Sequence, residues 1–169
     1  MTNPSSLPNL RVGIISCLFL TTLVVMTAFV GCQTPDTTSK FDEFVEREAI
    51  TAVMMRQQDA WNAGEIEAFM DDYVKSDTLR FTSGNTVRYG WETTLQRYYD
   101  TYPSREAMGE LTFSDLEIDV LSAEWALVFG SWYLVRGGEY ENIGGRYTLL
   151  LHHEEIGWKI LYDHTSQAN

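Results

Sequence analysis

Cysteine is nearly absent from this chain. The 169 residues include two cysteines, Cys17 and Cys32, and none follows Cys32. The stretch from residue 33 onward therefore has no disulfide, no thiol nucleophile and no thiolate ligand for a metal. A domain in this stretch must be stabilised by its hydrophobic core instead.

Positive charge is also scarce. The chain has 12 Lys and Arg residues against 24 Asp and Glu residues, which gives a formal net charge of −12 at pH 7. A surface with this balance repels phosphate backbones and anionic lipid headgroups. We therefore expect no nucleic-acid partner.

Several motifs for metal, phosphate and nucleophilic chemistry are missing. His152 and His153 are consecutive on an expected strand, so their side chains point to opposite faces and do not form a metal site. The glycine pairs at 137–138 and 144–145 flank an expected hairpin loop and do not open a helix, so no phosphate-binding loop is predicted. No Gly-x-Ser-x-Gly motif occurs. We expect neither a metal nor a cofactor.

The longest apolar run lies near the N-terminus, where Arg11 precedes residues 12–30. A positive start, an apolar centre and a small residue before the cut are typical of an export signal. We therefore divide the chain into a signal peptide at residues 1–31, a polar tether at residues 32–40 and a folded domain at residues 41–169.

The end of this run, Val30-Gly31-Cys32, resembles the end of a bacterial lipobox, with Phe29 where Leu is usual. The resemblance implies that Cys32 is lipidated and that the domain is held in the bacterial cell envelope, on the periplasmic or exoplasmic side. Gln33 is not Asp, which favours the outer membrane in a Gram-negative host. The alternative is an uncleaved membrane anchor, because the run is about as long as a spanning helix.

From residue 41 onward, apolar residues recur first at helical spacing and later in strand-like alternation. The expected helices start at Ser39 or Asp42 and stop at Asn62-Ala63-Gly64, and then cover Glu65–Val74 and Trp91–Tyr102. The expected strands are a short hairpin, Leu79–Thr82 with Thr86–Tyr89, and four longer segments, Leu111–Ser122, Trp125–Arg136, Arg146–His153 and Trp158–Ser166. The pattern predicts an α+β domain: three N-terminal helices packed on a curved, mainly antiparallel sheet that encloses a cone-shaped pocket.

This order of elements resembles the nuclear transport factor 2-like superfamily, in its SnoaL-like branch. The stretches that carry the resemblance are AWNAGEIEAF (Ala60–Phe69), the hairpin from Phe81 to Gly90, FGSWYLVR (Phe129–Arg136), GGRYTLLL (Gly144–Leu151) and GWKILYDHTS (Gly157–Ser166). The resemblance implies a cone-shaped fold that often forms homodimers through the outer face of the sheet. It implies no single chemistry, because the fold hosts isomerases, dehydratases, epoxide hydrolases and binding domains without enzymatic activity.

Aromatic residues are more numerous than a minimal core requires. Those expected to line the pocket are Trp61, Tyr73, Trp91, Tyr98 and Trp132. Each can also be an ordinary core residue, because aromatic rings on a cone serve either as packing or as pocket wall.

Arg146 and Thr148 share one face of their strand. If that face lines the cone, the Arg146 guanidinium can clamp a carboxylate with two hydrogen bonds. The alternative is an ion pair between Arg146 and a strand carboxylate, from Asp115, Glu117 or Asp119.

Strict alternation along the last strand places His164 on the face of Trp158 and Ile160, with Asp163 on the other face. His164 is the candidate general base, and its alternative role is a structural histidine. Two functions remain open. The favoured one is a membrane-anchored domain, homodimeric, that binds a small carboxylated or aromatic molecule; the other is a SnoaL-like enzyme, such as an isomerase, a cyclase or a hydratase or hydrolase, with a general acid or base in the cone.

Overall fold

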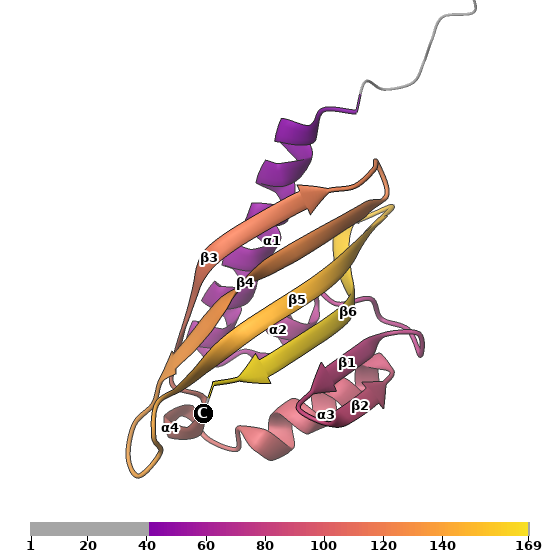
Figure 1. Cartoon of the computed structure of the whole chain (residues 1–169). Coiled ribbons are helices and arrows are strands. Elements are labelled where there is room, and N and C mark those ends of the chain that lie inside the picture. The colour runs from indigo at the N-terminus through magenta and orange to yellow at the C-terminus, as the bar shows by residue number, and fades with distance from the viewer. Residues whose placement is uncertain (1–40, 169) are drawn as a thin grey trace, which may run out of the picture. The chain divides into compact units, whose positions relative to one another are not determined.

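A long helix, α1 (Glu43–Ala63), opens the part of the chain that the computed structural model describes, residues 41–168 (Figure 1). The Asp42 side chain caps it by accepting a hydrogen bond of 3.1 Å from the Phe44 amide. Gly64 ends it in the left-handed conformation, with φ at 85°. Of the two predicted starts, Ser39 and Asp42, the structure has Asp42, and the predicted end at Gly64 is confirmed.

The buried side of α1 is a stripe at helical spacing. Its members are Ile50, Val53, Met54, Gln57 and Trp61, and each is at most 3% exposed. Residues three and four positions apart lie on one face of a helix, so this stripe packs as a unit against the sheet.

Three shorter helices follow: α2 (Ile66–Met70), α3 (Trp91–Thr101) and α4 (Arg105–Met108). The first two correspond to the predicted second and third helices, although α2 ends earlier than predicted. The sequence analysis did not predict α4, a single turn capped by Ser104, whose side chain accepts from the Ala107 amide.

Six strands form one sheet. They are β1 (Arg80–Ser83), β2 (Thr86–Tyr89), β3 (Glu110–Val120), β4 (Trp125–Val135), β5 (Ile143–Glu154) and β6 (Gly157–Gln167). Their order across the sheet is β2-β1-β6-β5-β4-β3, and every pairing is antiparallel except the one between β1 and β6. The predicted α+β fold with a mainly antiparallel, curved sheet is confirmed.

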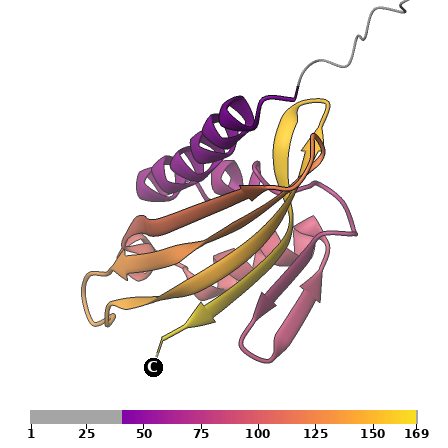
Figure 2. The same cartoon turned by 45° about the horizontal axis from the view of Figure 1, so that its top comes forward.

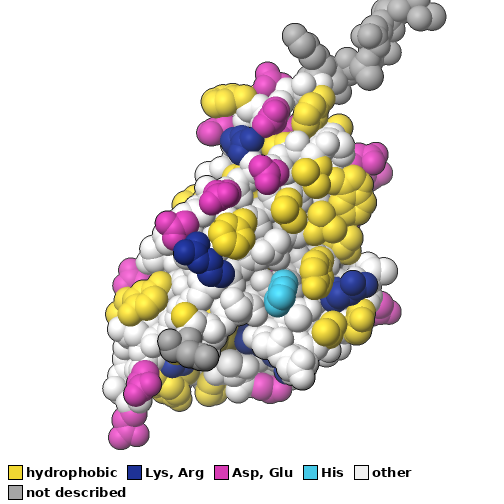
Figure 3. Space-filling model, viewed as in Figure 1, with side chains coloured by type: hydrophobic (Ala, Val, Ile, Leu, Met, Phe, Trp, Pro, Cys, Tyr) yellow, Lys and Arg dark blue, Asp and Glu magenta, His cyan; other side chains and the backbone are white. Residues whose placement is uncertain are grey.

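The helices lie on one side of this sheet, as Figures 1 and 2 show from two directions. We call the side they cover the inner face; on β4 and β5 it carries Ala126, Val128, Tyr147, Leu149 and Leu151, all of them buried. Figure 3 views the opposite side, the outer face, where hydrophobic side chains gather over the strands between charged ones. Among the described residues, no helix covers that face.

The predicted signal peptide, the tether and Cys32 lie outside the described residues. Within residues 41–168, no helix is long and apolar enough to cross a membrane.

Candidate functional site

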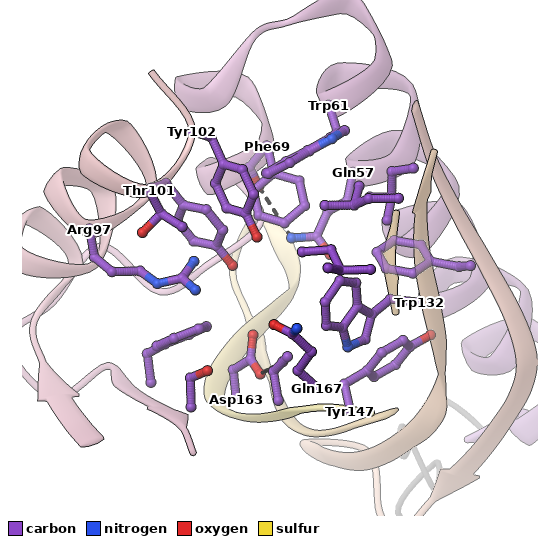
Figure 4. A pocket seen from close by; sticks show the side chains of 18 of the residues that line it. Gln57, Trp61, Phe69, Arg97, Thr101, Tyr102, Trp132, Tyr147, Asp163 and Gln167 are labelled. Atoms are coloured by element: carbon purple, nitrogen blue, oxygen red, sulfur yellow. Dashed lines mark hydrogen bonds between the residues drawn. The ribbon is translucent and has the colours of Figure 1, made fainter. Parts of the chain in front are cut away.

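A cavity of about 260 Å³ lies between the helices and the inner face of the sheet (Figure 4). This volume is just below the range of roughly 300–1,000 Å³ that is usual for ligand sites. The residues around it come from helices α1, α2 and α3 and from strands β1, β3, β4, β5 and β6. Most are apolar or aromatic, and a few polar groups project among them. The space therefore suits a small molecule with an apolar body and few polar groups.

The wall and the core of the domain are built from the same aromatic residues. The Trp61 ring packs edge-on against Phe69, Tyr98 and Tyr102, with centroids 5.2, 5.9 and 4.8 Å away. Its indole nitrogen donates a hydrogen bond of 3.3 Å to the Met108 carbonyl oxygen. The rings are thus fixed by their mutual packing, so the cavity has a rigid side.

Four of the five aromatic residues expected in the pocket line this cavity: Trp61, Tyr73, Tyr98 and Trp132. Trp91 does not line it, so its predicted placement is wrong. Trp91 starts α3 and donates its indole hydrogen to the Met70 carbonyl oxygen, 2.8 Å away, which holds the ring in the contact between helices α2 and α3.

An irregularity in β6 decides which of its side chains face the cavity. Leu151 pairs with Ile160, whereas the preceding residue, Leu150, pairs with Tyr162. Leu161 is therefore an extra residue on β6, which is a β-bulge. Because side chains alternate between the two faces of a sheet, one extra residue moves all later side chains to the opposite face.

The bulge reverses the predicted roles of Asp163 and His164. Asp163 is 3% exposed and lines the cavity, whereas His164 is exposed on the outer face. The prediction that His164 points into the cone as a general base is wrong, because strict alternation from Trp158 and Ile160 ignores the bulge. The carboxylate that the sequence analysis assigned to the other face is the one that enters the cavity.

Two hydroxyl groups hold the buried carboxylate of Asp163. The Tyr73 hydroxyl donates to Oδ2 at 2.8 Å, and the Thr165 hydroxyl donates to Oδ1 at 2.7 Å. Burial raises the pKa of Asp163 above its ordinary value, while these two hydrogen bonds and the nearby charge of Arg97 oppose that rise. Asp163 therefore keeps its proton to a higher pH than an exposed aspartate does.

The tyrosines around Asp163 stay neutral hydrogen-bonding groups. Burial, and then the charge of Asp163, raise the pKa of Tyr73 well above its ordinary value, and the same two causes raise the pKa of Tyr98 and of Tyr147. The Tyr147 hydroxyl is buried and has no hydrogen-bond partner among the described residues. It fits against Gly130, where an added Cβ would lie 2.3 Å from the hydroxyl oxygen, so glycine makes room for it.

Arg146 and Thr148 lie on the outer face and do not line the cavity. Arg146 is exposed, its Nη1 lies 3.7 Å from Oδ2 of Asp115, and its guanidinium lies 5.5 Å from the Phe129 ring centroid. The expectation that this face lines the cone is wrong, because the alternate residues of β5 occupy the inner face. The alternative reading of Arg146, an ion pair with a strand carboxylate, describes its position.

Sequence reasoning overlooked Arg97 as a cavity residue. It lies on α3 next to Tyr98, which the sequence analysis expected in the pocket, and its guanidinium reaches the cavity.

Among the described residues, no group of three or more His, Cys, Asp or Glu side chains could hold a metal ion.

No protein-family model and no curated protein matches this chain. Solved structures do. A nuclear transport factor 2-like protein of unknown function from Shewanella oneidensis shares 36% identity over 71% of this chain and 98% of its own, with a TM-score of 0.67.

Two more distant structures share the fold. A nuclear transport factor 2-like superfamily protein from Salmonella enterica is 18% identical over 76% of this chain and 94% of its own, with a TM-score of 0.62. A ketosteroid isomerase-like protein from Erwinia carotovora is 19% identical over 76% of this chain and 99% of its own, with a TM-score of 0.61.

Proposed function

The chain belongs to the nuclear transport factor 2-like superfamily, and from that premise we propose that it binds a small, mainly apolar molecule in the cavity beneath its sheet. The observation that carries the proposal is a cavity with an apolar, aromatic wall into which two charged groups reach, the carboxyl of Asp163 and the guanidinium of Arg97. Small-molecule sites in proteins usually combine such a wall with a few placed polar groups. We further propose that the chain belongs to the SnoaL-like branch.

Tyr147→Phe tests whether the ligand also bonds to the buried hydroxyl of Tyr147. The variant keeps the ring and removes only the hydroxyl, so a ligand that bonds to it should bind about 2- to 12-fold more weakly, which corresponds to roughly 0.5–1.5 kcal/mol. Binders are first found by screening small aromatic fragments against ¹⁵N-labelled protein, and their affinities are then measured by calorimetry.

Tyr133→Phe is the matched control, because Tyr133 is 48% exposed on the outer face. It should leave affinity unchanged. A screen in which no fragment shifts the resonances of cavity residues would contradict the proposed function.

A second candidate is proton-transfer catalysis in the same cavity, of the isomerase, cyclase, hydratase or hydrolase kind. The observation that favours it is a buried carboxyl, Asp163, with a raised pKa and a tyrosine hydroxyl bonded to it. One structural neighbour is described as ketosteroid isomerase-like. In this reading Asp163, and not His164, is the general base, and Asp163→Asn abolishes turnover while the ligand still binds; turnover that survives the substitution would rule it out.

We also propose that Cys32 is lipidated and anchors the domain in the bacterial cell envelope. The support is the sequence Val30-Gly31-Cys32 after an apolar run. Intact-mass spectrometry of membrane-extracted protein should show an N-terminus at Cys32 carrying acyl chains, and Cys32→Ser should abolish that species. An intact N-terminus at Met1 in the wild-type protein would refute the proposal.

Finally, we propose a homodimer packed through the outer face. Apolar side chains that are half-buried or exposed there, such as Leu127, Leu150 and Val135, are covered by no described helix. Light scattering at micromolar concentration should give twice the monomer mass, and Leu127→Asp should give the monomer mass. Ile156→Asp, at a turn residue that is 79% exposed, is the control and should remain dimeric. A wild-type monomer would contradict this assembly.

A further inference from the structure

We infer, resting on the proposed ligand-binding function, that the ligand of the cavity is a small carboxylic acid whose carboxylate pairs with Arg97 and whose other end offers a neutral hydrogen-bond donor to Asp163. This assigns Arg97 as the residue that selects an anionic ligand.

Three aromatic rings surround the guanidinium of Arg97. Its central carbon lies 4.8 Å from the ring centroid of Phe81, 4.8 Å from that of Tyr98 and 5.7 Å from that of Tyr102. Rings attract the positive charge through their faces but leave the N–H groups without acceptors. Among the described residues, no carboxylate lies within ion-pair distance of Arg97, and no hydrogen bond is formed by its side chain.

The aromatic packing also fixes the direction of the side chain. Figure 4 shows Arg97 reaching from α3 toward the space bounded by Asp163 and Gln167, with Trp132 and Tyr147 on the far side. A guanidinium held in place before the ligand arrives loses little conformational freedom on binding. Its planar donors match a carboxylate, which accepts two parallel hydrogen bonds.

The charges around the cavity differ from those of the chain as a whole. The chain has twice as many acidic as basic residues, but the cavity lining contains two arginines, Arg97 and Arg136, and a single acid, Asp163. Arg136 is already engaged, since its Nε donates to the Glu141 carbonyl oxygen at 2.6 Å and its guanidinium lies over the Tyr140 ring. Of the two, Arg97 is the one whose side chain forms no hydrogen bond among the described residues, so we assign the anion of the ligand to it.

Asp163 sets the requirement at the other end of the ligand. An ionised carboxylate repels a second anion, so the ligand carboxylate must lie at Arg97 and away from Asp163. Asp163 already accepts two hydroxyl hydrogens and has lone pairs left for a further donor. A cavity of about 260 Å³ limits the body between the two ends to about one ring. The ligand class is thus a hydroxylated, single-ring carboxylic acid.

The test compares two matched probes, 4-hydroxybenzoate and its neutral amide, 4-hydroxybenzamide, by calorimetry and by ¹⁵N chemical-shift mapping. We expect the wild-type protein to bind the acid more tightly than the amide. Arg97→Gln should weaken the acid by about 10- to 100-fold, as expected for a charge-assisted contact, and leave the amide within about twofold. Arg97→Lys keeps the charge without the planar fork and should give an intermediate loss.

Arg80→Gln is the matched control. Arg80 also lies over two rings, those of Tyr89 and Tyr162 at 5.4 and 5.5 Å, but it is exposed and outside the cavity. It should leave both affinities unchanged. If Arg97→Gln does not fold, as judged by circular dichroism, Arg97→Lys alone decides the question.

Each remaining outcome has a defined meaning. If the amide binds the wild-type protein as tightly as the acid, or if an Arg97 substitution weakens both probes equally, the role of Arg97 in recognising an anion is overturned while the binding function stands. If neither these probes nor any fragment of the screen binds in the cavity, the proposed function itself fails.

Discussion

Trp61→Ala should lower the free energy of unfolding by about 3–5 kcal/mol, the range typical of removing a large aromatic side chain from a core. Trp61 is 2% exposed, contacts three other rings edge-on and donates a hydrogen bond to the Met108 carbonyl oxygen. The substitution leaves a void where α1, α2 and α3 meet and leaves that buried carbonyl without its donor. Both losses act in the same direction.

Urea unfolding followed by circular dichroism measures this effect. Trp125→Ala provides the control, because Trp125 is half-buried on the outer face and its ring packs against that of His152, with centroids 4.5 Å apart. Its loss should be clearly smaller. Equal losses for the two variants, or a loss below about 1 kcal/mol for Trp61→Ala, would mean that the aromatic cluster around the cavity does not form the core.

Asp163→Asn should change how stability depends on pH. Burial raises the pKa of Asp163, so the folded protein holds a proton at this site more tightly than the unfolded chain does. Between the ordinary aspartate pKa of about 3.9 and the raised native value, the free energy of unfolding therefore falls as pH rises, by at most about 1.4 kcal/mol per pH unit for one proton. This fall is the cost of ionising a buried carboxyl. Below the window Asp163 is protonated in both states and the cost is absent, and above the window it is ionised in both states and the cost is fully present. An asparagine side chain cannot ionise, so the variant lacks this cost.

The measurable quantity is the free energy of unfolding of Asp163→Asn minus that of the wild type, from urea titrations between pH 3.5 and 7.5, a range of about four units that brackets the ordinary pKa. This difference should increase with pH through the window and then level off. Asp119→Asn removes a carboxylate from an exposed position on the outer face and controls for the change in net charge. A difference that stays constant with pH would show that Asp163 ionises alike in the folded and unfolded states.

Much of the fold follows from local patterns in the sequence. The stripe from Ile50 to Trp61, the cap at Asp42 and the stop at Gly64 define α1 through rules that act within a few residues. The strand segments follow from alternation and from their aromatic and aliphatic residues. The short helix α4 was not predicted, because a single capped turn has too few residues to show a helical periodicity.

The site was harder to predict, because a shift of one residue in the register of β6 determines which of its side chains face the cavity. The amino-acid sequence around Leu161 does not distinguish a bulged strand from a regular one. The bulge is seen only in the pairing of β6 with β5. Arg97 was missed for a different reason. A charged side chain is expected to lie in solvent. The rings that hold Arg97 come from β1 and α3, which are brought together only in the tertiary structure. One signal was present: Arg97 directly precedes Tyr98, which the sequence analysis expected in the pocket.

The β6 bulge turns the Asp163 carboxyl into the aromatic cavity. The most direct test is a pH titration of its side-chain carboxyl carbon by ¹³C NMR, with the resonance assigned by its absence in Asp163→Asn. We expect this carbon to titrate with a pKa above the ordinary aspartate value of about 3.9, because the carboxyl is buried. A carboxyl that titrates at or below that value would contradict this, because burial would then not dominate the surroundings of Asp163.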